Sequence, residues 1–444
     1  MGKTLSADAS PEKRLFISLL TRDIPLVAAL LDLLDNSINS AVERYSDRLT
    51  TAEEYLAFFS DEAIQPHVKI ALNVSSDRVE IVDTASGISA AVARDHVFKF
   101  GRGDEPASDS DRLSVYGIGL KRAIFKLGNT IKMRSDHEDG GFDLKLDVAQ
   151  WAKLSEQPWT FKISTREASA AKTGTSIVVT DLYEDVKRRV SDGVFISELK
   201  EAIARTYAFY LAKVVSISVN DEQVEGVNID LGQNHASLTV AFGDVTCAMT
   251  AGIGIPEAGK FREKSSGWFV LCNGRAVVSA DKTALTGWGS ALPRFQPKHR
   301  PFLGTVFFVA KYPEELPWTT TKSGINEDSF VWQSAKRQMA SLGREVISFL
   351  DGRYTDEGTE VPSKDLQEAA GGAARVSVLS AAVATPKTFK APTATDVGTI
   401  RVQYDAHVTD IKRVAKYLRK PGMSGSDVGR HTFNYFLRNE VGEE

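Results

Sequence analysis

Asp32, Asp35 and Asn36 stand together in LLDLLDNSINSA, residues 30–41, inside an otherwise apolar pattern. Side chains of these types could gather oxygen ligands around a divalent cation such as Mg²⁺, and a carboxylate beside them could act as a general base. Asp32 and Asn36 are four residues apart, so a helix would place them on one face, opposite the apolar residues. The alternative is an ordinary amphipathic helix with its polar side in water.

A second candidate is Asp83 in VEIVDTASGIS, where a strand pattern ends and small residues follow through Gly87. A carboxylate at a strand end, next to a glycine, can approach a flat base and accept a hydrogen bond from its exocyclic amine. The alternative is a strand-to-loop turn that the aspartate caps.

Two further stretches could bind phosphate. Gly117 and Gly119 in SVYGIGLKRAIFKLG precede a helical pattern, and free backbone N–H groups at a helix N-terminus attract anions. Lys322 in LPWTTTKSGIN could reach a phosphate from a loop rich in threonine. Taken alone, a GxG pair is most often a turn, and a loop lysine is most often solvated.

Periodic patterns predict the elements that position these residues. Residues 23–45 have apolar side chains at spacings of three and four, which is typical of a helix with one buried face. HVKIALNV and RVEIVD, separated by SSD, predict a hairpin. Further alternating runs are TIKMRS, FDLKLDV, TFKISTR and TSIVVTDLY. Residues 1–190 are therefore predicted to form a helix layer against a mostly antiparallel sheet.

The rest of the chain divides by composition. Residues 191–352 combine an amphipathic helix, several strand patterns and a closing helix at 329–350, which predicts an α/β domain. Residues 353–395 are rich in Ala, Gly, Pro and Thr and are interpreted as a linker. Residues 396–444 predict a small helical module of two helices, broken at KPGMSGSD.

Composition excludes several classes. The net charge of −4 gives no global attraction to nucleic acid, and two cysteines cannot form a disulfide framework. No apolar run approaches the ~20 residues that cross a bilayer, and the N-terminal residues lack a signal-peptide core. We therefore expect a cytoplasmic protein without a membrane partner.

Taken together and in this order, the motifs resemble those of the GHKL (Bergerat-fold) ATPases, which include type II topoisomerase ATPase subunits, MutL proteins, heat-shock chaperones and microrchidia (MORC) proteins. DLLDNS resembles the first family motif, DTASG the second, SVYGIG the third, and the Gly174–Thr175 pair the fourth. YGIGLKRAIFKLG looks most like the MORC-type branch. CNGRAVV and TTTKSG look like the transducer domain that follows, so the resemblance covers about residues 15–350.

The resemblance implies an α+β fold, in which a Bergerat-type helix and sheet sandwich precedes an α/β transducer domain, and it implies ATP and Mg²⁺ as cofactors. By this resemblance Asn36 is the Mg²⁺ ligand, and Asp32 is the general base that deprotonates the attacking water. Asp83 would bind the adenine amine, and Gly87 and Thr175 would complete the base pocket.

The resemblance also implies how phosphate is held. Gly117, Gly119 and Lys121 would contact the phosphates, and FGRGDEPASDSDRLS, residues 100–114, would form a mobile lid over them. Lys322 would reach the γ-phosphate only when its domain swings onto the first.

Three departures from the family pattern bear on turnover. Ala85 and Ser114 replace glycines, which binding tolerates. Asp32 replaces the usual glutamate and is shorter by one methylene, or about 1.5 Å of reach. Because a misplacement of ~1 Å can cost ~100-fold in rate, we expect slow hydrolysis.

These features lead to two hypotheses. The first is an ATP-driven switch or clamp that dimerises on ATP and acts on a macromolecular client; DNA transactions or prokaryotic anti-phage defence would be the setting by analogy. The alternative is a nucleotide-binding regulatory or scaffold subunit with negligible turnover. A sensor histidine kinase is disfavoured because we see no dimerising helix with a phosphoacceptor histidine.

The tail leaves its partner open. Residues 401–438 hold eight Lys or Arg against three Asp, which suits either nucleic-acid contact or a solvated helix face. Phe433, Tyr435 and Phe436 could anchor a protein partner, as aromatic residues often do at interfaces, or could pack the module's own core.

Overall fold

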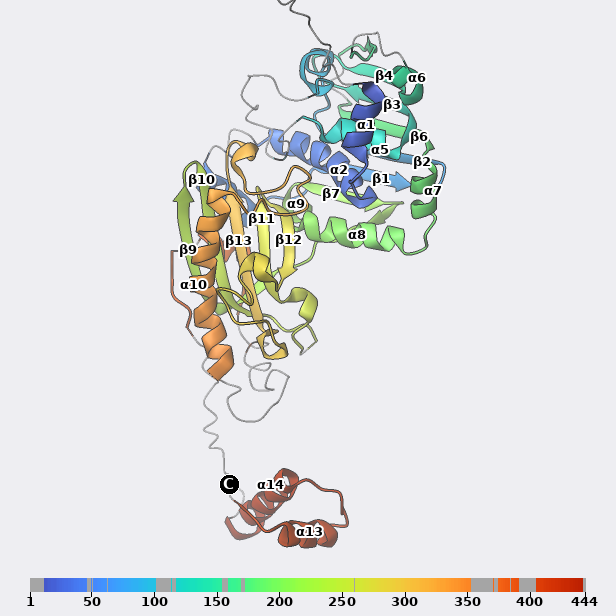
Figure 1. Ribbon diagram of the computed structural model, residues 1–444. Coiled ribbons are helices and arrows are strands. Elements are labelled where there is room, and N and C mark those ends of the chain that lie inside the picture. Colours follow the sequence, from blue (N-terminus) through green and yellow to red (C-terminus); the bar gives the residue numbers. More distant parts are fainter. Residues whose placement is uncertain are drawn as a thin grey trace, which may run out of the picture. The chain divides into compact units, whose positions relative to one another are not determined.

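The computed structural model describes residues 12–45, 49, 51–61, 63–100, 113, 117–153, 159–168, 172–258, 260–352, 370, 374–383, 385–390 and 405–441. The chain forms two compact units, Met1–Thr393 and Ala394–Glu444. The first unit contains two sheets with helices packed on them, and the second contains helices (Figure 1). The fold is α+β, as predicted.

Eight strands form the first sheet in the order β5-β4-β3-β6-β2-β1-β7-β8. Neighbouring strands are antiparallel, except that β1 and β7 run parallel. The predicted β1–β2 hairpin is confirmed. The strands are β1 (Val68–Val74), β2 (Arg78–Asp83), β3 (Gly128–Asp136), β4 (Phe142–Asp147), β5 (Ile163–Thr165), β6 (Gly174–Leu182), β7 (Val215–Val219) and β8 (Glu222–Gln223).

Helices α1, α2 and α5 lie together over one face of this sheet (Figure 1). Apolar residues of α2 and α5 are buried against it, which gives the first domain its core. The helices before the second sheet are α1 (Lys13–Thr21), α2 (Leu26–Glu43), α3 (Ala52–Ser60), α4 (Ala90–Val92), the wide turn η2 (Ala93–Val97), α5 (Gly119–Leu127), α6 (Val148–Lys153), α7 (Glu184–Val190), α8 (Phe195–Thr206) and α9 (Ala208–Lys213).

Helix α2 is buried on almost every side. It begins directly after Pro25, whose ring suits a helix start. Its polar residues Asp32, Asp35 and Asn39 are buried together with its apolar ones, and Asn36 is half-buried. An amphipathic helix with its polar side in water is therefore wrong for this segment. Buried polar side chains need partners, and these partners build the site described below.

Six strands form the second sheet in the order β12-β11-β13-β10-β9-β14, with the long helix α10 packed along it (Figure 1). All pairs are antiparallel except β11 with β13. The elements are β9 (Asp230–Phe242), β10 (Val245–Gly254), β11 (Gly267–Cys272), β12 (Arg275–Asp281), β13 (Phe302–Val309), α10 (Phe330–Gly352), β14 (Arg375–Ser377) and α12 (Val378–Val383).

Part of the segment interpreted as a linker is ordered against this domain. Strand β14 pairs with β9, and Lys387 pairs through its backbone with Ser237 of β9. Helix α12 follows β14 and buries Val378 and Leu379 between β9 and α3. The interpretation as linker is therefore wrong for residues 375–383, because VSVL supplies an apolar run able to cover the sheet edge. The predicted boundaries at 190, 352 and 395 stay predictions.

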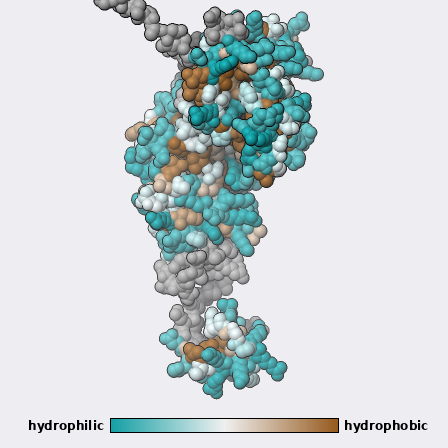
Figure 2. All heavy atoms as spheres, turned by 45° about the vertical axis from the view of Figure 1, so that its right-hand side comes forward, coloured by the Kyte–Doolittle hydropathy of each residue, from teal (hydrophilic) through white to brown (hydrophobic). Residues whose placement is uncertain are grey.

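The second unit contains α13 (Val408–Tyr417) and α14 (Gly425–Phe436), followed by the turn Leu437–Val441. Ser424 caps α14 by accepting a hydrogen bond from the Asp427 amide. Among the described residues of this unit, only Ala415 and Val428 are buried. Figure 2 shows a hydrophobic area on its surface.

Across the described ranges, no helix combines the length and the apolar character needed to cross a membrane.

Candidate functional site

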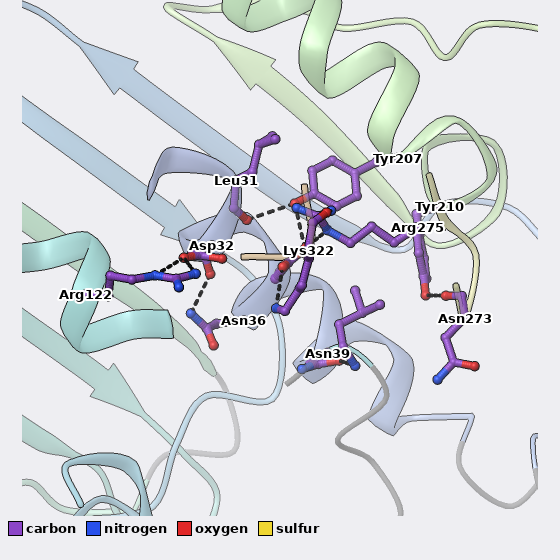
Figure 3. Close-up of polar contacts among 12 residues, drawn as sticks. Leu31, Asp32, Asn36, Asn39, Arg122, Tyr207, Tyr210, Asn273, Arg275 and Lys322 are labelled. Carbon is purple, nitrogen blue, oxygen red and sulfur yellow. Dashed lines mark hydrogen bonds and ion pairs between the residues drawn. The ribbon is translucent and has the colours of Figure 1, made fainter. Parts of the chain in front are cut away.

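Asp32 is held by an arginine from the helix that follows the glycine-rich stretch. The Arg122 side chain on α5 donates to Asp32 Oδ2 from Nε at 3.0 Å and also from Nη2 (Figure 3). The two side chains are 5% and 1% exposed, so water does not screen the pair. Helices α2 and α5 pack against each other and bring the two charges together.

Asp35, one turn further along α2, is the centre of a larger network. Its Oδ1 lies 2.7 Å from the Tyr207 hydroxyl and 3.0 Å from Arg275 Nε, and its Oδ2 lies 2.7 Å from Lys322 Nζ. These three partners are labelled in Figure 3. Tyr207 lies between α8 and α9, Arg275 starts β12, and Lys322 lies in the loop before α10. Three later segments therefore converge on one carboxylate of α2.

The two carboxylates have opposite electrostatic environments. Burial raises the pKa of Asp32, and this effect outweighs the neighbouring Lys322 and Arg122 charges. Burial also acts on Asp35, but Arg275 and Lys322 together hold the pKa of that carboxyl below its usual value. When two neighbouring carboxyl groups have pKa values that are shifted in opposite directions, they often take different chemical roles. Asp35 thus suits a permanent anion, and Asp32 suits a proton acceptor.

Asn36 uses only the nitrogen of its side-chain amide in contacts with the described residues. Its Nδ2 donates to the Asp32 carbonyl at 2.7 Å, which fixes the direction of the amide. No described residue donates a hydrogen bond to its Oδ1. An oriented amide oxygen is the kind of ligand that Mg²⁺ prefers, so the donor set fits the predicted role of Asn36.

Asp83 ends β2 and lies at the centre of a second group. Its Oδ1 accepts from the backbone N–H groups of Ala85 and Thr175 at 3.1 Å each, and its Oδ2 accepts from Ser37 Oγ at 2.7 Å. Burial raises the pKa of Asp83, although these hydrogen bonds oppose the shift. Ser37 follows Asn36 on α2, so the two groups are joined through this helix. The bond to Ala85 confirms that Asp83 caps a turn, and Oδ2, which accepts one bond from Ser37, can accept a second.

The glycines of this group allow close backbone approach. Gly87 has φ +73°, and a Cβ there would meet the Asp136 carbonyl oxygen at 2.0 Å. Gly174 has φ +142°, and a Cβ there would meet the Asp83 carbonyl oxygen at 2.2 Å. Thr175 Oγ1 lies 2.9 Å from Ser135 Oγ. The structure therefore brings Asp83, Gly87 and Thr175 together, as predicted for the base pocket.

The glycine-rich stretch leads into α5 as predicted. Gly117 has φ +60°, and Gly119 is the first residue of the helix, where a Cβ would lie 3.7 Å from Asp32 Cγ. The N-terminal backbone of α5 therefore lies beside the Asp32 carboxylate. Residues 101–112 and 114–116, which hold most of the predicted lid and Ser114, lie outside the described residues.

Lys121 is directed elsewhere. Its Nζ donates to the carbonyls of Val97 and Lys99, at 2.7 and 2.6 Å, where the wide turn η2 ends. Burial lowers the pKa of Lys121 to about 8. In this conformation Lys121 holds the segment that leads into residues 101–112. Its predicted phosphate contact stays a prediction and would require that the side chain turn away from these carbonyls.

Several residues of the site were not predicted. Arg122 follows Lys121 in the glycine-rich motif, and Arg275 lies within CNGRAVV, but neither had been assigned a partner. Tyr207 looked like one aromatic residue of an amphipathic helix. The only signal for Asp35 was its place in an apolar helix pattern, which implies that a buried carboxylate must find cations.

A comparison with family models matched residues 24–175 to the family described as histidine kinase-, DNA gyrase B- and HSP90-like ATPase. The matched segment contains α2, the hairpin that ends at Asp83, α5, and the start of β6 at Gly174 and Thr175. A comparison with curated proteins gave no match. Kinship with the MORC-type branch stays a prediction. Residues 24–175 therefore match a GHKL-type ATPase domain, which supports ATP binding and hydrolysis in general.

Proposed function

We propose that this protein is a slow ATP-hydrolysing conformational switch. In this proposal Lys322, which belongs to the domain with the second sheet, contacts the γ-phosphate and thereby distinguishes ATP from ADP. The observation that carries the proposal is the 2.7 Å contact between Lys322 and Asp35. It brings a lysine from a distant loop to the helix that also bears Asp32 and Asn36. A cation in this position supports a role in sensing phosphate.

The charge balance of the site supports an anionic ligand. The buried cations Arg122, Arg275 and Lys322 face two buried carboxylates, Asp32 and Asp35. Among these five described side chains one positive charge is in excess, in surroundings that water screens little. A phosphate group would compensate this charge, and the N-terminus of α5 beside Asp32 would add backbone donors.

The described residues suit ATP and Mg²⁺. Asp83, Gly87 and Thr175 would hold the adenine, and Asn36 would hold the Mg²⁺. Gly117 and Gly119 would contact the phosphates, and Lys121 would join them once its side chain turns away from the Val97 and Lys99 carbonyls. Bound Mg²⁺ neutralises phosphate charge and polarises the phosphoryl oxygen. Asp32 would orient and deprotonate the attacking water, since its Oδ1 is not used by the Arg122 contact.

Slow turnover has two supporting features. Asp32 is shorter than the glutamate of the family, and its Oδ2 is bound to Arg122. The contact with Arg122 occupies Oδ2, so only Oδ1 is left to orient and deprotonate a water molecule. The same features keep the alternative open, a nucleotide-binding regulatory or scaffold subunit with negligible turnover.

Dimerisation on ATP would transmit the nucleotide state to a macromolecular client, and DNA stays one candidate client. In the C-terminal unit, Phe433, Tyr435 and Phe436 are 52%, 61% and 56% exposed. Their exposure supports a protein-binding surface and disfavours a role as the unit's own core.

Phosphate release and sedimentation together test the proposal. Wild type should release phosphate slowly and dimerise with a non-hydrolysable ATP analogue. Asp32→Asn should bind ATP without releasing phosphate, because an amide cannot accept the proton. Lys322→Ala should bind ATP but neither hydrolyse it efficiently nor dimerise, whereas Lys264→Ala, an exposed lysine of the same domain, should behave like wild type.

Binding without phosphate release in wild type would favour the regulatory alternative. Equal dimerisation by wild type and Lys322→Ala would refute the role of Lys322.

A further inference from the structure

Asp35, Arg275 and Lys322 form a closed ring of three contacts. Arg275 Nε donates to Asp35 Oδ1 at 3.0 Å, Lys322 Nζ donates to Asp35 Oδ2 at 2.7 Å, and Arg275 Nη1 donates to the Lys322 carbonyl. The Asp35 carboxylate therefore holds Lys322 in two ways. It binds the lysine ammonium directly, and it binds Arg275, which in turn donates to the backbone carbonyl of Lys322. All three residues are buried.

The loop that carries Lys322 needs such a hold. Lys322 has φ +53°, in the left-handed region that non-glycine residues rarely adopt. The turn is closed by Lys322 N–H to the Thr319 carbonyl at 2.8 Å and by Thr319 N–H to the Gly324 carbonyl at 2.9 Å. Trp318 and Ile325 are buried at its base. The ring fixes the tip of this turn against α2.

We propose that Asp35 is a positioning residue that holds Lys322 beside Asp32 and Asn36 before nucleotide arrives. The proposal rests on the proposed function of the site. An ammonium group has three N–H donors, and one of them is directed at Asp35. The others can meet a phosphate oxygen without breaking the Asp35 contact, so Asp35 itself does not touch ATP.

Stability alone does not explain the ring. Buried ion pairs contribute little net stability compared with apolar residues of similar volume. The ring instead fixes a flexible, four-carbon side chain in one position. Holding a reacting or stabilising group in place before the substrate binds lowers the entropic cost of reaching the transition state. Loss of the ring should therefore lower kcat strongly and change KM little.

A double-mutant cycle on kcat tests whether Asp35 acts through Lys322. We expect Lys322→Gln and Asp35→Asn each to lower kcat by about tenfold or more, the equivalent of one charge-assisted hydrogen bond, with KM within about threefold of wild type. The double variant should lie within about twofold of Lys322→Gln. Asp351→Asn removes an ion-paired carboxylate of the same domain, away from the site, and should leave kcat unchanged.

The proposal would be overturned if the loss of kcat in the double variant equalled the product of the losses in the two single variants. An unchanged kcat in folded Asp35→Asn would also overturn it. Two buried cations without a carboxylate could prevent Asp35→Asn from folding. The comparison of Lys322→Gln with the double variant still decides the question, because the double variant keeps the net charge of the ring. A kcat of the double variant that lies about tenfold below that of Lys322→Gln would show that Asp35 acts independently of Lys322.

Hydrogen exchange provides a readout that does not depend on turnover. In nucleotide-free protein, Asp35→Asn should speed amide exchange in residues 317–326 and leave β13 unchanged. Unchanged exchange in the loop would refute positioning, and faster exchange throughout the domain would indicate a merely structural role. If wild type releases no phosphate, the proposed function fails, and the exchange result still decides the role of Asp35.

Discussion

Replacing Asp83 with asparagine should weaken ATP binding about thirtyfold while the fold is kept. Oδ1 accepts two backbone N–H groups, from Ala85 and Thr175 at 3.1 Å each. An amide can keep both bonds only by placing its oxygen there. Its NH₂ group then takes the place of Oδ2, 2.7 Å from the Ser37 hydroxyl, which can turn to accept.

This orientation presents a donor to the adenine amine, which is itself a donor. The lost charge-assisted bond is equivalent to roughly 1.5–3 kcal/mol, and about 2 kcal/mol corresponds to about thirtyfold in Kd. Calorimetric titration with ATP measures the change directly. Ser37→Ala is the matched control: it removes one hydrogen bond to Oδ2 but keeps the acceptor, so its effect should be several times smaller.

The pH dependence gives a second check on the same residue. Burial raises the pKa of Asp83 above its ordinary value, and only the ionised form is a full acceptor. Wild-type affinity should therefore fall as pH drops through this raised pKa, and the gap between wild type and Asp83→Asn should narrow toward acid. A folded Asp83→Asn protein that binds ATP like wild type would remove Asp83 from the site.

Three other predictions concern stability and the tail. Burial lowers the pKa of Lys121 from 10.5 to about 8, so the unfolded chain holds more protons between these values. The free energy of unfolding of wild type should then rise between pH 8 and 10.5, by up to about 3 kcal/mol more than that of Lys121→Met. Urea unfolding of both proteins at pH 7.5 and 10 would measure this difference, and an equal pH dependence of the two would contradict the prediction. Gly174→Ala should lower the free energy of unfolding, measured by thermal unfolding, by about 1–3 kcal/mol, because the new Cβ would meet the Asp83 carbonyl oxygen at 2.2 Å. Gly193→Ala is the control and should be close to neutral, because a Cβ there would have no neighbour within 4 Å. Deleting residues 396–444 should leave ATP affinity unchanged and abolish partner recruitment; loss of ATP binding would assign the tail to the ATPase body.

Local patterns predicted the elements that carry the site. The apolar spacing of residues 23–45 predicted α2, alternation predicted β1 and β2, and the glycines before an apolar stripe predicted α5. Each signal depends on residues close in sequence, where periodicity reports which face is buried. The motifs then predicted that Asp83, Gly87 and Thr175 would meet, and the structure brings them together.

Contacts between distant segments could not be predicted in this way. A chain with this many Asp and Glu residues offers Arg122 and Arg275 many possible ion-pair partners. Only the packing of the helices and strands selects Asp32 for Arg122 and Asp35 for Arg275. The direction of Lys121 depends on where the turn η2 ends. Residues 375–383 were misread because an Ala- and Gly-rich composition masked a short apolar run.

The parallel pairing of β7 with β1 has a consequence for how the protein is made. Synthesis proceeds from the N-terminus, so β1 leaves the ribosome long before Val215–Val219 exist to cover its edge. An uncovered strand edge invites pairing with other chains, and sheets closed by such distant segments form slowly. A fragment that ends near residue 190 would keep this edge permanently open and should aggregate, whereas one that extends beyond β8 should stay dispersed. The candidate site shares the delay, since Tyr207, Arg275 and Lys322 reach Asp35 only after the first sheet is closed.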